Sequence, residues 1–174
     1  MQNYHENGKI NRVSPVPWKQ KLFMNITRGK TFPLGAIVQP DGVNFAVYSK
    51  NAVAVDLLLF NTADDAKPSE TIRLDPRTNR TYHYWHCFVP GIKPGQLYGY
   101  HVHGPYEPRL GLRFDAEKLL LDPYGRGVAV PKKYNRRAAS QPGDNTATAM
   151  KSVVVDPRTY DWEGDTPPRR PFSK

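Results

Sequence analysis

Acidic side chains are the first residues to test for catalytic chemistry, because two carboxylates set opposite each other can act as acid and base in hydrolysis. The neighbouring acidic residues of this sequence form three groups: Asp64 with Asp65, Asp115 with Glu117, and Asp161 with Glu163 and Asp165. All three groups lie in stretches of loop, turn or connector composition. Carboxylates in such stretches are usually solvated surface groups. We therefore assign no catalytic residue.

Histidine and cysteine are the next candidates, as metal ligands or nucleophiles. His101 and His103 are two positions apart, so they share one face of a strand and could bind a metal together. No third ligand stands at suitable spacing, which favours structural histidines. The single cysteine, Cys87, lies in an aromatic run without a base placed by a motif, and is interpreted as core filler. The sequence predicts neither a metal site nor a cofactor.

Aromatic residues are the remaining chemical signal, with ten tyrosines and three tryptophans concentrated in the middle of the chain. Flat rings on a sheet can stack on the C–H faces of sugar rings, and they also build the cores of β-sandwiches. For Trp85 and Tyr100 we favour core or interdomain packing. Any sugar contact is expected at the exposed members of a set formed by Tyr82, Tyr84, Trp85 and Tyr98.

Strands separated by turns must position these side chains. Apolar and polar residues alternate, or β-branched and aromatic residues gather, in six stretches: 36–38, 43–48, 53–60, 70–74, 82–89 and 97–103. Val43, Phe45 and Val47 share one face, as do Val53, Val55, Leu57 and Leu59, while Asp56 points away. Turn signals recur between the stretches without a helical pattern. The prediction is all-β, an immunoglobulin-like antiparallel β-sandwich.

The chain divides into four segments by composition. Residues 1–28 are predicted to form a flexible basic tail, and residues 29–108 the complete sandwich. Residues 109–150 are predicted to be an irregular extension with one helical turn at 116–121. Residues 151–174 should hold one strand and a proline-rich linker. The apolar clusters 119–121 and 153–155 are expected to need another surface.

Charge and composition limit the partners and the compartment. The formal net charge of +9 over 174 residues is spread over the tail, the extension and the final residues, without a known nucleic-acid-binding motif. We predict no nucleic-acid partner, and no membrane partner because no apolar run of about 20 residues is present. One cysteine and the lack of a secretory signal favour a cytoplasmic location, or a plastid if the source is a plant.

Several stretches, read together in order, resemble the isoamylase-type debranching enzymes of the α-amylase clan, glycoside hydrolase family 13. They are Phe32–Ala36 with Asp41–Ser49, Val53–Phe60, Trp85–His86, Pro90–Gly91, Pro94–Pro105, Arg113–Asp115 with Lys118–Tyr124, Val153–Asp156, and Tyr160–Asp165 with Pro167–Pro168 and Pro171. The matching part is similar to the amino-terminal module of that family, of carbohydrate-binding module family 48 type.

The resemblance implies a module that precedes a barrel hydrolysing α-1,6 branch linkages of glycogen or starch in carbohydrate catabolism. The barrel needs about 250 residues, so the chain is expected to stop before it and to be inactive alone. The family's distinctive motif implies that one set of residues packs on the barrel, namely Tyr100, His103, Pro105, Arg113, Phe114, Leu121, Asp122, Pro123 and Tyr124.

The implied partners are the missing barrel and, through the parent enzyme, an α-glucan. The paired tryptophans of glycogen-binding relatives are absent, so the resemblance favours a supporting role with at most weak glucan contact. An autonomous glycogen- or starch-binding module and a basic nucleic-acid-binding protein stay open as alternatives.

Overall fold

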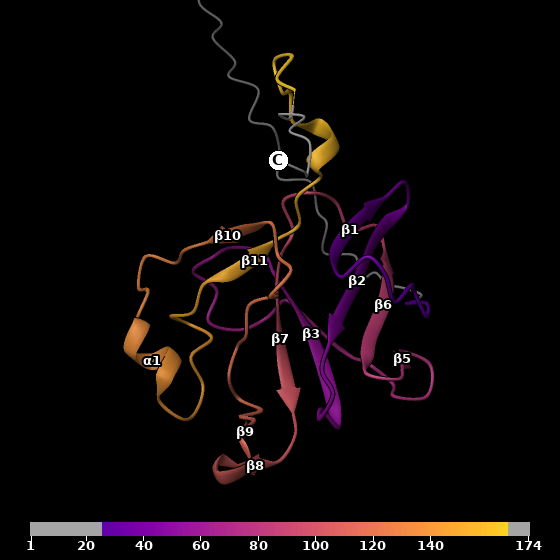
Figure 1. The fold of residues 1–174 in the computed structure, drawn as a ribbon. Helices are drawn as coiled ribbons and strands as arrows, with labels where there is room; N and C mark the ends of the chain where they lie inside the picture. Colours follow the sequence, from indigo (N-terminus) through magenta and orange to yellow (C-terminus); the bar gives the residue numbers. More distant parts are fainter. Residues whose placement is uncertain (1–25, 167–174) are drawn as a thin grey trace, which may run out of the picture.

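Two antiparallel sheets packed face to face form the molecule, which a computed structural model describes over residues 26–166 (Figure 1). The first sheet has the order β1-β2-β6-β5, with β1 at Gly35–Gln39, β2 at Gly42–Tyr48, β6 at Tyr84–Pro90 and β5 at Arg80–Thr81. The second has the order β10-β11-β7-β3-β4, with β10 at Gly127–Ala129, β11 at Lys151–Val153, β7 at Leu97–His103, β3 at Ala54–Phe60 and β4 at Glu70–Arg73. The predicted all-β, immunoglobulin-like sandwich is confirmed.

Short elements complete the described chain. They are the β8–β9 pair at Tyr106–Glu107 and Leu112–Arg113, the 3-10 helices η1 at Pro108–Leu110 and η2 at Pro157–Thr159, and the helix α1 at Arg136–Ser140. Asn135 caps α1 by accepting hydrogen bonds from the backbone nitrogens of Arg137 and Ala138. No helix within residues 26–166 has the length and apolar character needed to cross a bilayer.

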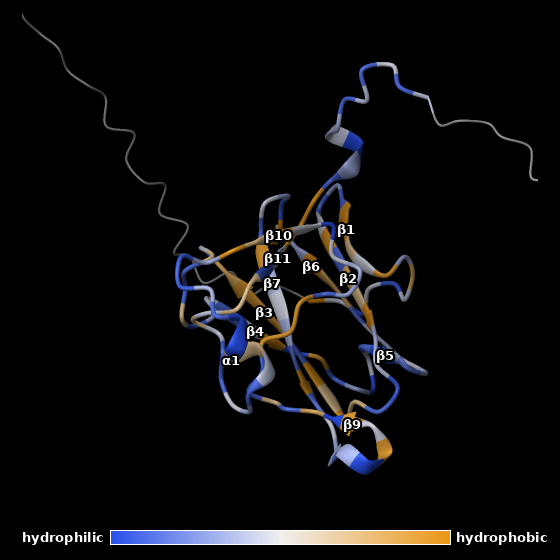
Figure 2. Cartoon of the chain, turned by 60° about the vertical axis from the view of Figure 1, so that its left-hand side comes forward, coloured by the Kyte–Doolittle hydropathy of each residue, from blue (hydrophilic) through white to orange (hydrophobic). Residues whose placement is uncertain are grey.

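The core lies between the sheets and follows the predicted alternation. One buried cluster joins the inner faces of β2 (Val43, Phe45 and Val47) and β3 (Val55, Leu57 and Leu59). Residues of β6 and β7 complete the same cluster: Trp85, Cys87, Val89, Tyr98, Tyr100 and Val102. Figure 2 shows apolar residues on the strands and polar residues on α1 and the outer loops. The assignment of Val53 to the inner face was wrong, because Val53 precedes β3 and is exposed.

The strand predicted at 82–89 begins two residues later in the structure, at Tyr84. Tyr82 and His83 form the turn between β5 and β6, and the backbone of Tyr82 has a φ of 58°, outside the strand region. Alternation from Tyr84 onward directs Trp85 and Cys87 into the core. Burial raises the pKa of the Cys87 thiol to about 12, which suits its interpretation as core filler.

The sandwich is not complete at residue 108, and this corrects the expectation. Strand β11 pairs with β7, Ser152 lying opposite Tyr98, and β10 adds to β11. The helical turn expected at 116–121 is replaced by an antiparallel bridge in which Leu120 and Tyr100 exchange both backbone hydrogen bonds at 2.9 Å. Leu119 and Val154 are buried in this chain itself, so the two apolar clusters are partly covered without another surface.

The glycine in the middle of β7 permits this arrangement. A Cβ added at Gly99 would lie 2.7 Å from Leu119 Cδ1 and 3.0 Å from the Leu120 carbonyl oxygen. Both distances are shorter than an ordinary van der Waals contact. Leu119 instead packs over Gly99 into a second apolar cluster with Leu58 and Phe60, so the outer face of the second sheet is also covered.

The described start of the chain is tied to the first sheet. Thr27 bridges Phe88 of β6, and the Nδ1 of His86 lies 2.6 Å from the Arg28 carbonyl oxygen. Asn44 accepts from the backbone nitrogen of Lys30 at 2.7 Å. Residues 26–28 are therefore part of the sandwich rather than of a tail, and the rest of the predicted tail, residues 1–25, lies outside the described residues.

Buried lysines fasten the extension between β10 and β11. The Nζ of Lys151 donates to the carbonyl oxygens of Ala63 at 2.6 Å and Thr146 at 3.2 Å, and lies 4.7 Å from the centroid of the Phe60 ring. The Nζ of Lys118 donates to the Ala138 and Gly143 carbonyl oxygens. Sequence composition predicted an irregular extension here, and these contacts give it fixed anchors.

Replacing Lys151 by Met should lower the free energy of unfolding by about 1–3 kcal/mol, because the Ala63 and Thr146 carbonyl oxygens lose their donor while the apolar packing is largely retained. Urea unfolding followed by tryptophan fluorescence measures the change. Lys93→Met, at an exposed turn, is the matched control and should leave stability within about 0.5 kcal/mol. Equal effects of the two substitutions would contradict the anchoring role.

Candidate functional site

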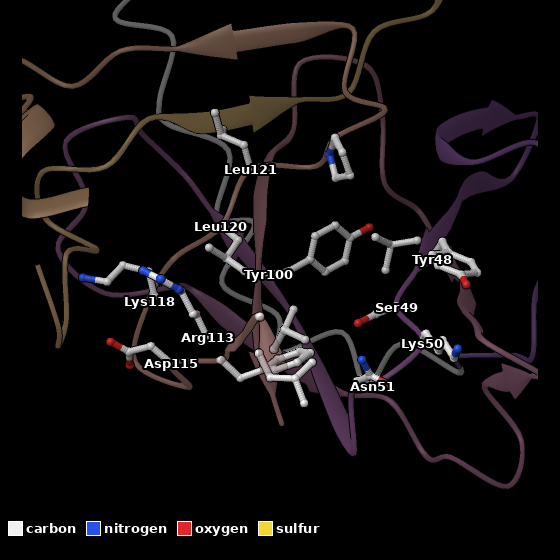
Figure 3. A pocket seen from close by; sticks show the side chains of 16 residues that line it. Tyr48, Ser49, Lys50, Asn51, Tyr100, Arg113, Asp115, Lys118, Leu120 and Leu121 are labelled. Atoms are coloured by element: carbon white, nitrogen blue, oxygen red, sulfur yellow. The ribbon is translucent and has the colours of Figure 1, made fainter. Parts of the chain in front are cut away.

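An open cleft of about 650 Å³ lies at one end of the sandwich. One wall is the end of β2 and the residues that follow, 47–51, and the other is formed by residues 111–123. Figure 3 shows Tyr48, Ser49, Lys50 and Asn51 on one side and Arg113, Asp115, Lys118, Leu120 and Leu121 on the other, with the Tyr100 ring between them. The volume falls in the range of ordinary ligand pockets.

Tyr100 carries the unusual feature of this cleft. Its residue surface is 2% exposed, and its hydroxyl oxygen is buried without a hydrogen-bond partner among residues 26–166. Burial raises the pKa of Tyr100 well above its ordinary value, so the hydroxyl stays protonated and able to donate. Buried tyrosine hydroxyls normally find a partner. The neighbouring Tyr98 does so, donating to Asp122 Oδ2 at 2.8 Å.

The cleft combines an aliphatic lining with a polar rim. Its apolar lining includes Val47, Val102, Leu112, Leu120 and Leu121. On the rim, Asp115 accepts backbone hydrogen bonds from Gly143 at 2.8 Å and Glu117 at 3.0 Å.

These backbone hydrogen bonds lower the pKa of Asp115, the bond from Gly143 most, which is opposite to the change that a general acid needs. Asp115 thus supports a turn and closes the loop at Gly143. It is a structural carboxylate.

The other acidic groups also accept hydrogen bonds from backbone nitrogens. Asp65 accepts from the Thr62 hydroxyl at 2.6 Å and from the backbone nitrogens of Asn61 and Thr62, and these bonds lower its pKa. Asp161 accepts from the backbone nitrogen of Glu163 at 2.8 Å. Asp64 accepts from the backbone nitrogen of Lys132 at 2.7 Å, so it ties its loop to a distant part of the chain.

His101 and His103 lie on the outer side of β7 near a buried carboxylate. His103 Nε2 is 2.8 Å from Asp56 Oδ2, and Arg73 forms an ion pair with the other Asp56 oxygen. Within residues 26–166, no three His, Cys, Asp or Glu side chains gather closely enough to hold a metal ion. His101 Nε2 is buried without a partner there. These histidines are parts of the sheet's polar packing.

The cleft contains only some of the residues that sequence assigned to barrel packing. Tyr100, Arg113, Phe114, Leu121 and Pro123 line it. The remaining members lie around it: His103 bonds Asp56, Asp122 accepts from Tyr98 and from the Tyr124 backbone nitrogen, and Pro105 follows β7.

Phe114 is seated over Gly104, where an added Cβ would come within 2.6 Å of its ring. This close approach places the ring in the wall of the cleft.

Sequence reasoning missed the opposite wall, Tyr48 to Asn51. Tyr48 was predicted as the last residue of a strand, and residues 49–51 had no assigned role between two predicted strands. Trp85 Nε1 donates to the Ser49 carbonyl oxygen at 3.3 Å, which fixes this wall to the core.

The four tyrosine and tryptophan residues expected to offer sugar contacts separate into two kinds. Trp85 and Tyr98 are 0% exposed, because strand alternation turns both into the core, so neither presents a surface to a sugar. Tyr82 is 76% exposed and Tyr84 is half-buried. The core assignment of Trp85 and Tyr100 is confirmed.

The fold and the cleft define the class of protein: an immunoglobulin-like β-sandwich module with an open apolar cleft at one end. The family described as Carbohydrate-binding module 48 (Isoamylase N-terminal domain) matches residues 33–125, and the chain belongs to that family. The resemblance found in the sequence is therefore confirmed.

Relatives at the sequence level are much longer proteins. The chain is 42% identical over 154 residues to the glycogen debranching enzyme of Serratia proteamaculans, covering 86% of the chain and 22% of the relative. It is 38% identical over 152 residues to "Isoamylase 1, chloroplastic" of Arabidopsis thaliana, covering 86% of the chain and 19% of the relative. The chain thus spans about a fifth of the length of these relatives.

Solved structures agree on the fold. A pullulanase of Paenibacillus barengoltzii complexed with maltotriose superposes with a TM-score of 0.55 at 19% identity, over 83% of the chain and 18% of that protein. A multi-modular glycogen-degrading pneumococcal virulence factor gives a TM-score of 0.56 at 20% identity, over 80% of the chain and 14% of that protein. At these identities the likeness shows the fold alone.

Stability should fall as the pH drops below about 6.5, because burial lowers the pKa of His101 from 6.5 in the folded chain. The unfolded chain then binds the proton more readily, so stability present above pH 6.5 is lost as the pH falls through the lowered value. His101→Gln should flatten this slope between about pH 7.5 and 5 in urea titrations. Parallel slopes for the parent chain and the variant would contradict the assignment to His101.

Proposed function

We propose that this chain is the non-catalytic amino-terminal part of a debranching enzyme that hydrolyses α-1,6 branch linkages of glycogen or starch, and that its cleft receives another part of that enzyme. The Tyr100 hydroxyl, which has no partner in the described part of the chain, carries the proposal, because a buried donor facing an apolar cleft suits an occupant that brings both an acceptor and apolar side chains. A polypeptide segment has both.

The lining of the cleft favours protein over sugar as the occupant. Aliphatic side chains such as Val102, Leu112 and Leu121 resemble the interior of a domain, whereas sugars need many fixed hydrogen bonds. Leu120 and Leu121 are also partly exposed beside the cleft. An open apolar hollow with exposed leucines at its edge is typical of an interface.

The rest of the proposed enzyme is inferred from the relatives. Those named glycogen debranching enzyme and isoamylase are several times longer than the matched part, which leaves room for a catalytic barrel of about 250 residues. In the proposal the barrel packs on Tyr100, Arg113, Phe114, Leu121 and Pro123, while His103, Pro105, Asp122 and Tyr124 keep the surrounding loops in place.

The remaining assignments follow from the same proposal. The stretch after β11, where Tyr160 and Trp162 are exposed and form an edge-to-face pair, serves as the connector. The partners are the barrel and, through the enzyme, an α-glucan, with neither nucleic acid nor membrane. The lone buried Cys87 suits a reducing compartment, the cytoplasm or a plastid.

Tyr100→Phe should change stability in opposite directions in two settings. In the 174-residue chain it removes a buried hydroxyl that has no partner among residues 26–166, so the free energy of unfolding should rise by about 1 kcal/mol. In the full-length enzyme the hydroxyl has its acceptor, so the same change should lower stability by about 1 kcal/mol. Urea unfolding of the chain and calorimetry of the full-length enzyme measure the two effects.

Tyr98→Phe is the matched control for this experiment, because its hydroxyl already bonds Asp122 within the chain. It should destabilise the chain and the full-length enzyme alike. A gain in stability from Tyr100→Phe in both settings would show that nothing reaches the hydroxyl and would overturn the docking proposal. A loss in both would show that the hydroxyl is paired within the chain.

The 174-residue chain should release no reducing ends from glycogen, amylopectin or pullulan, because its described acidic loops hold backbone and do not form an acid–nucleophile pair. A reducing-sugar assay over a long incubation tests this expectation. Hydrolysis by pure protein that disappears with one substitution in this chain would contradict it.

A further inference from the structure

One edge of the second sheet ends in a short apolar strand that is open to solvent. β10 is the last strand of the order β10-β11-β7-β3-β4, and among residues 26–166 it pairs with β11 alone (Figure 1). Val128 of this strand is 50% exposed and Val130, just beyond it, is 58% exposed. Edge strands usually carry a charge, a proline or a bulge that prevents pairing with another chain. The sequence of β10, Gly-Val-Ala, has neither charge nor proline.

Basic side chains surround this edge. Residues 123–143 contain no aspartate or glutamate and five basic residues, which are Arg126, Lys132, Lys133, Arg136 and Arg137. All five are exposed, and within residues 26–166 none of them forms an ion pair with a carboxylate. Arg126 directly precedes β10 and Lys132 follows Pro131, so cations flank the strand at both ends. We call β10, Val130 and the five cations the basic edge.

The rest of the chain holds the backbone of the basic edge in place. Asp64 accepts from the Lys132 backbone nitrogen at 2.7 Å, and the Asn135 backbone nitrogen donates to the Thr148 carbonyl oxygen at 3.2 Å. The backbone nitrogen of Tyr134 donates to the carbonyl oxygen of Pro131, a buried residue, at 3.1 Å. A partner therefore meets a backbone that is already ordered, which lowers the entropic cost of binding.

We infer that the basic edge binds an extended acidic segment of another protein, which adds to the second sheet as a further strand beside β10. Backbone groups along an open edge pair with an extended peptide, as in other cases of strand addition. Val128 and Val130 offer apolar contacts to the middle of such a segment, and the flanking cations attract its carboxylates. The matching segment has apolar residues between acidic ones.

Charge and chemistry favour this partner over two others. A second copy that paired edge to edge would bring the same five cations to the contact, and like charges repel. Nucleic acid would satisfy the cations through its phosphates, but it would use neither the strand's backbone nor the exposed valines. An acidic peptide uses all three features of the basic edge.

The basic edge and the cleft are separate surfaces. β11, which carries β10, pairs with Leu97 and Tyr98 at the start of β7, whereas the cleft includes Tyr100 and Val102 farther along the same strand. None of the five cations lines the cleft. A partner can thus occupy the basic edge while the cleft is filled, and the inference does not depend on what fills it.

A fluorescein-labelled peptide of nine residues, alternating glutamate and valine, is the probe for this inference. We expect the 174-residue chain to bind it in anisotropy titrations, with ¹H–¹⁵N shift changes centred on residues 126–137. Lys132→Gln combined with Lys133→Gln should weaken binding about fivefold, because exposed ion pairs each contribute modestly. The same peptide with proline in place of valine keeps its charge but lacks half of its strand donors, so it should bind about tenfold more weakly.

Arg77→Gln combined with Arg109→Gln is the matched control, because it removes the same charge at two exposed positions outside the basic edge. It should leave the affinity within about twofold, since distant surface charges are screened by salt. Melting temperatures verify that all variants fold. Absence of binding, an equal loss in the control, or equal binding of the proline peptide would each overturn the inference. Tighter binding of duplex DNA than of the peptide at physiological salt would also overturn it.

Discussion

The close approach of residues 119–121 to β7 is the constraint on which the remaining architecture depends. Position 99 holds glycine, and any side chain there would meet Leu119 and the Leu120 carbonyl. The approach lets Leu120 pair with Tyr100. Leu120 and β11 therefore pair with neighbouring residues of the same strand, β7. The far wall of the cleft follows directly from that pairing, because the chain then runs on through Leu121 and Pro123.

Tyr48, the last residue of β2, forms the boundary between the first sheet and the cleft. Trp85 connects this boundary to the core through the Ser49 carbonyl, and Arg80 covers the same tryptophan ring from outside. One buried indole therefore positions the loop that forms one wall of the cleft.

Local patterns in the sequence were sufficient for the four longest strands, since each of β2, β3, β6 and β7 turns alternate side chains into the core. They also located β11, which lies in the strand expected from residue 151 onward, but they did not give its pairing with β7. They missed β10, which has three residues and forms by pairing with β11. Five cleft residues came from the family motif, whereas the wall at Tyr48–Asn51 has no local signal. The predicted strand began too early, at Tyr82, because the residue types from 82 to 89 favour strands. The turn at Tyr82 is seen only in its backbone angle.

Pairing between β7 and β11 has a consequence for biosynthesis. Leu97 and its partner Val153 are 56 positions apart, so a growing chain exposes the unpaired edge of β7 until the later strand has left the ribosome. Leu58 and Phe60 are separated from Ala149 by an even longer stretch of chain, 91 and 89 positions. During translation the first sheet can assemble early, while the second sheet lacks β10 and β11 and leaves apolar surface exposed. Apolar surface and an unpaired strand edge of this kind promote aggregation until the later strands pair.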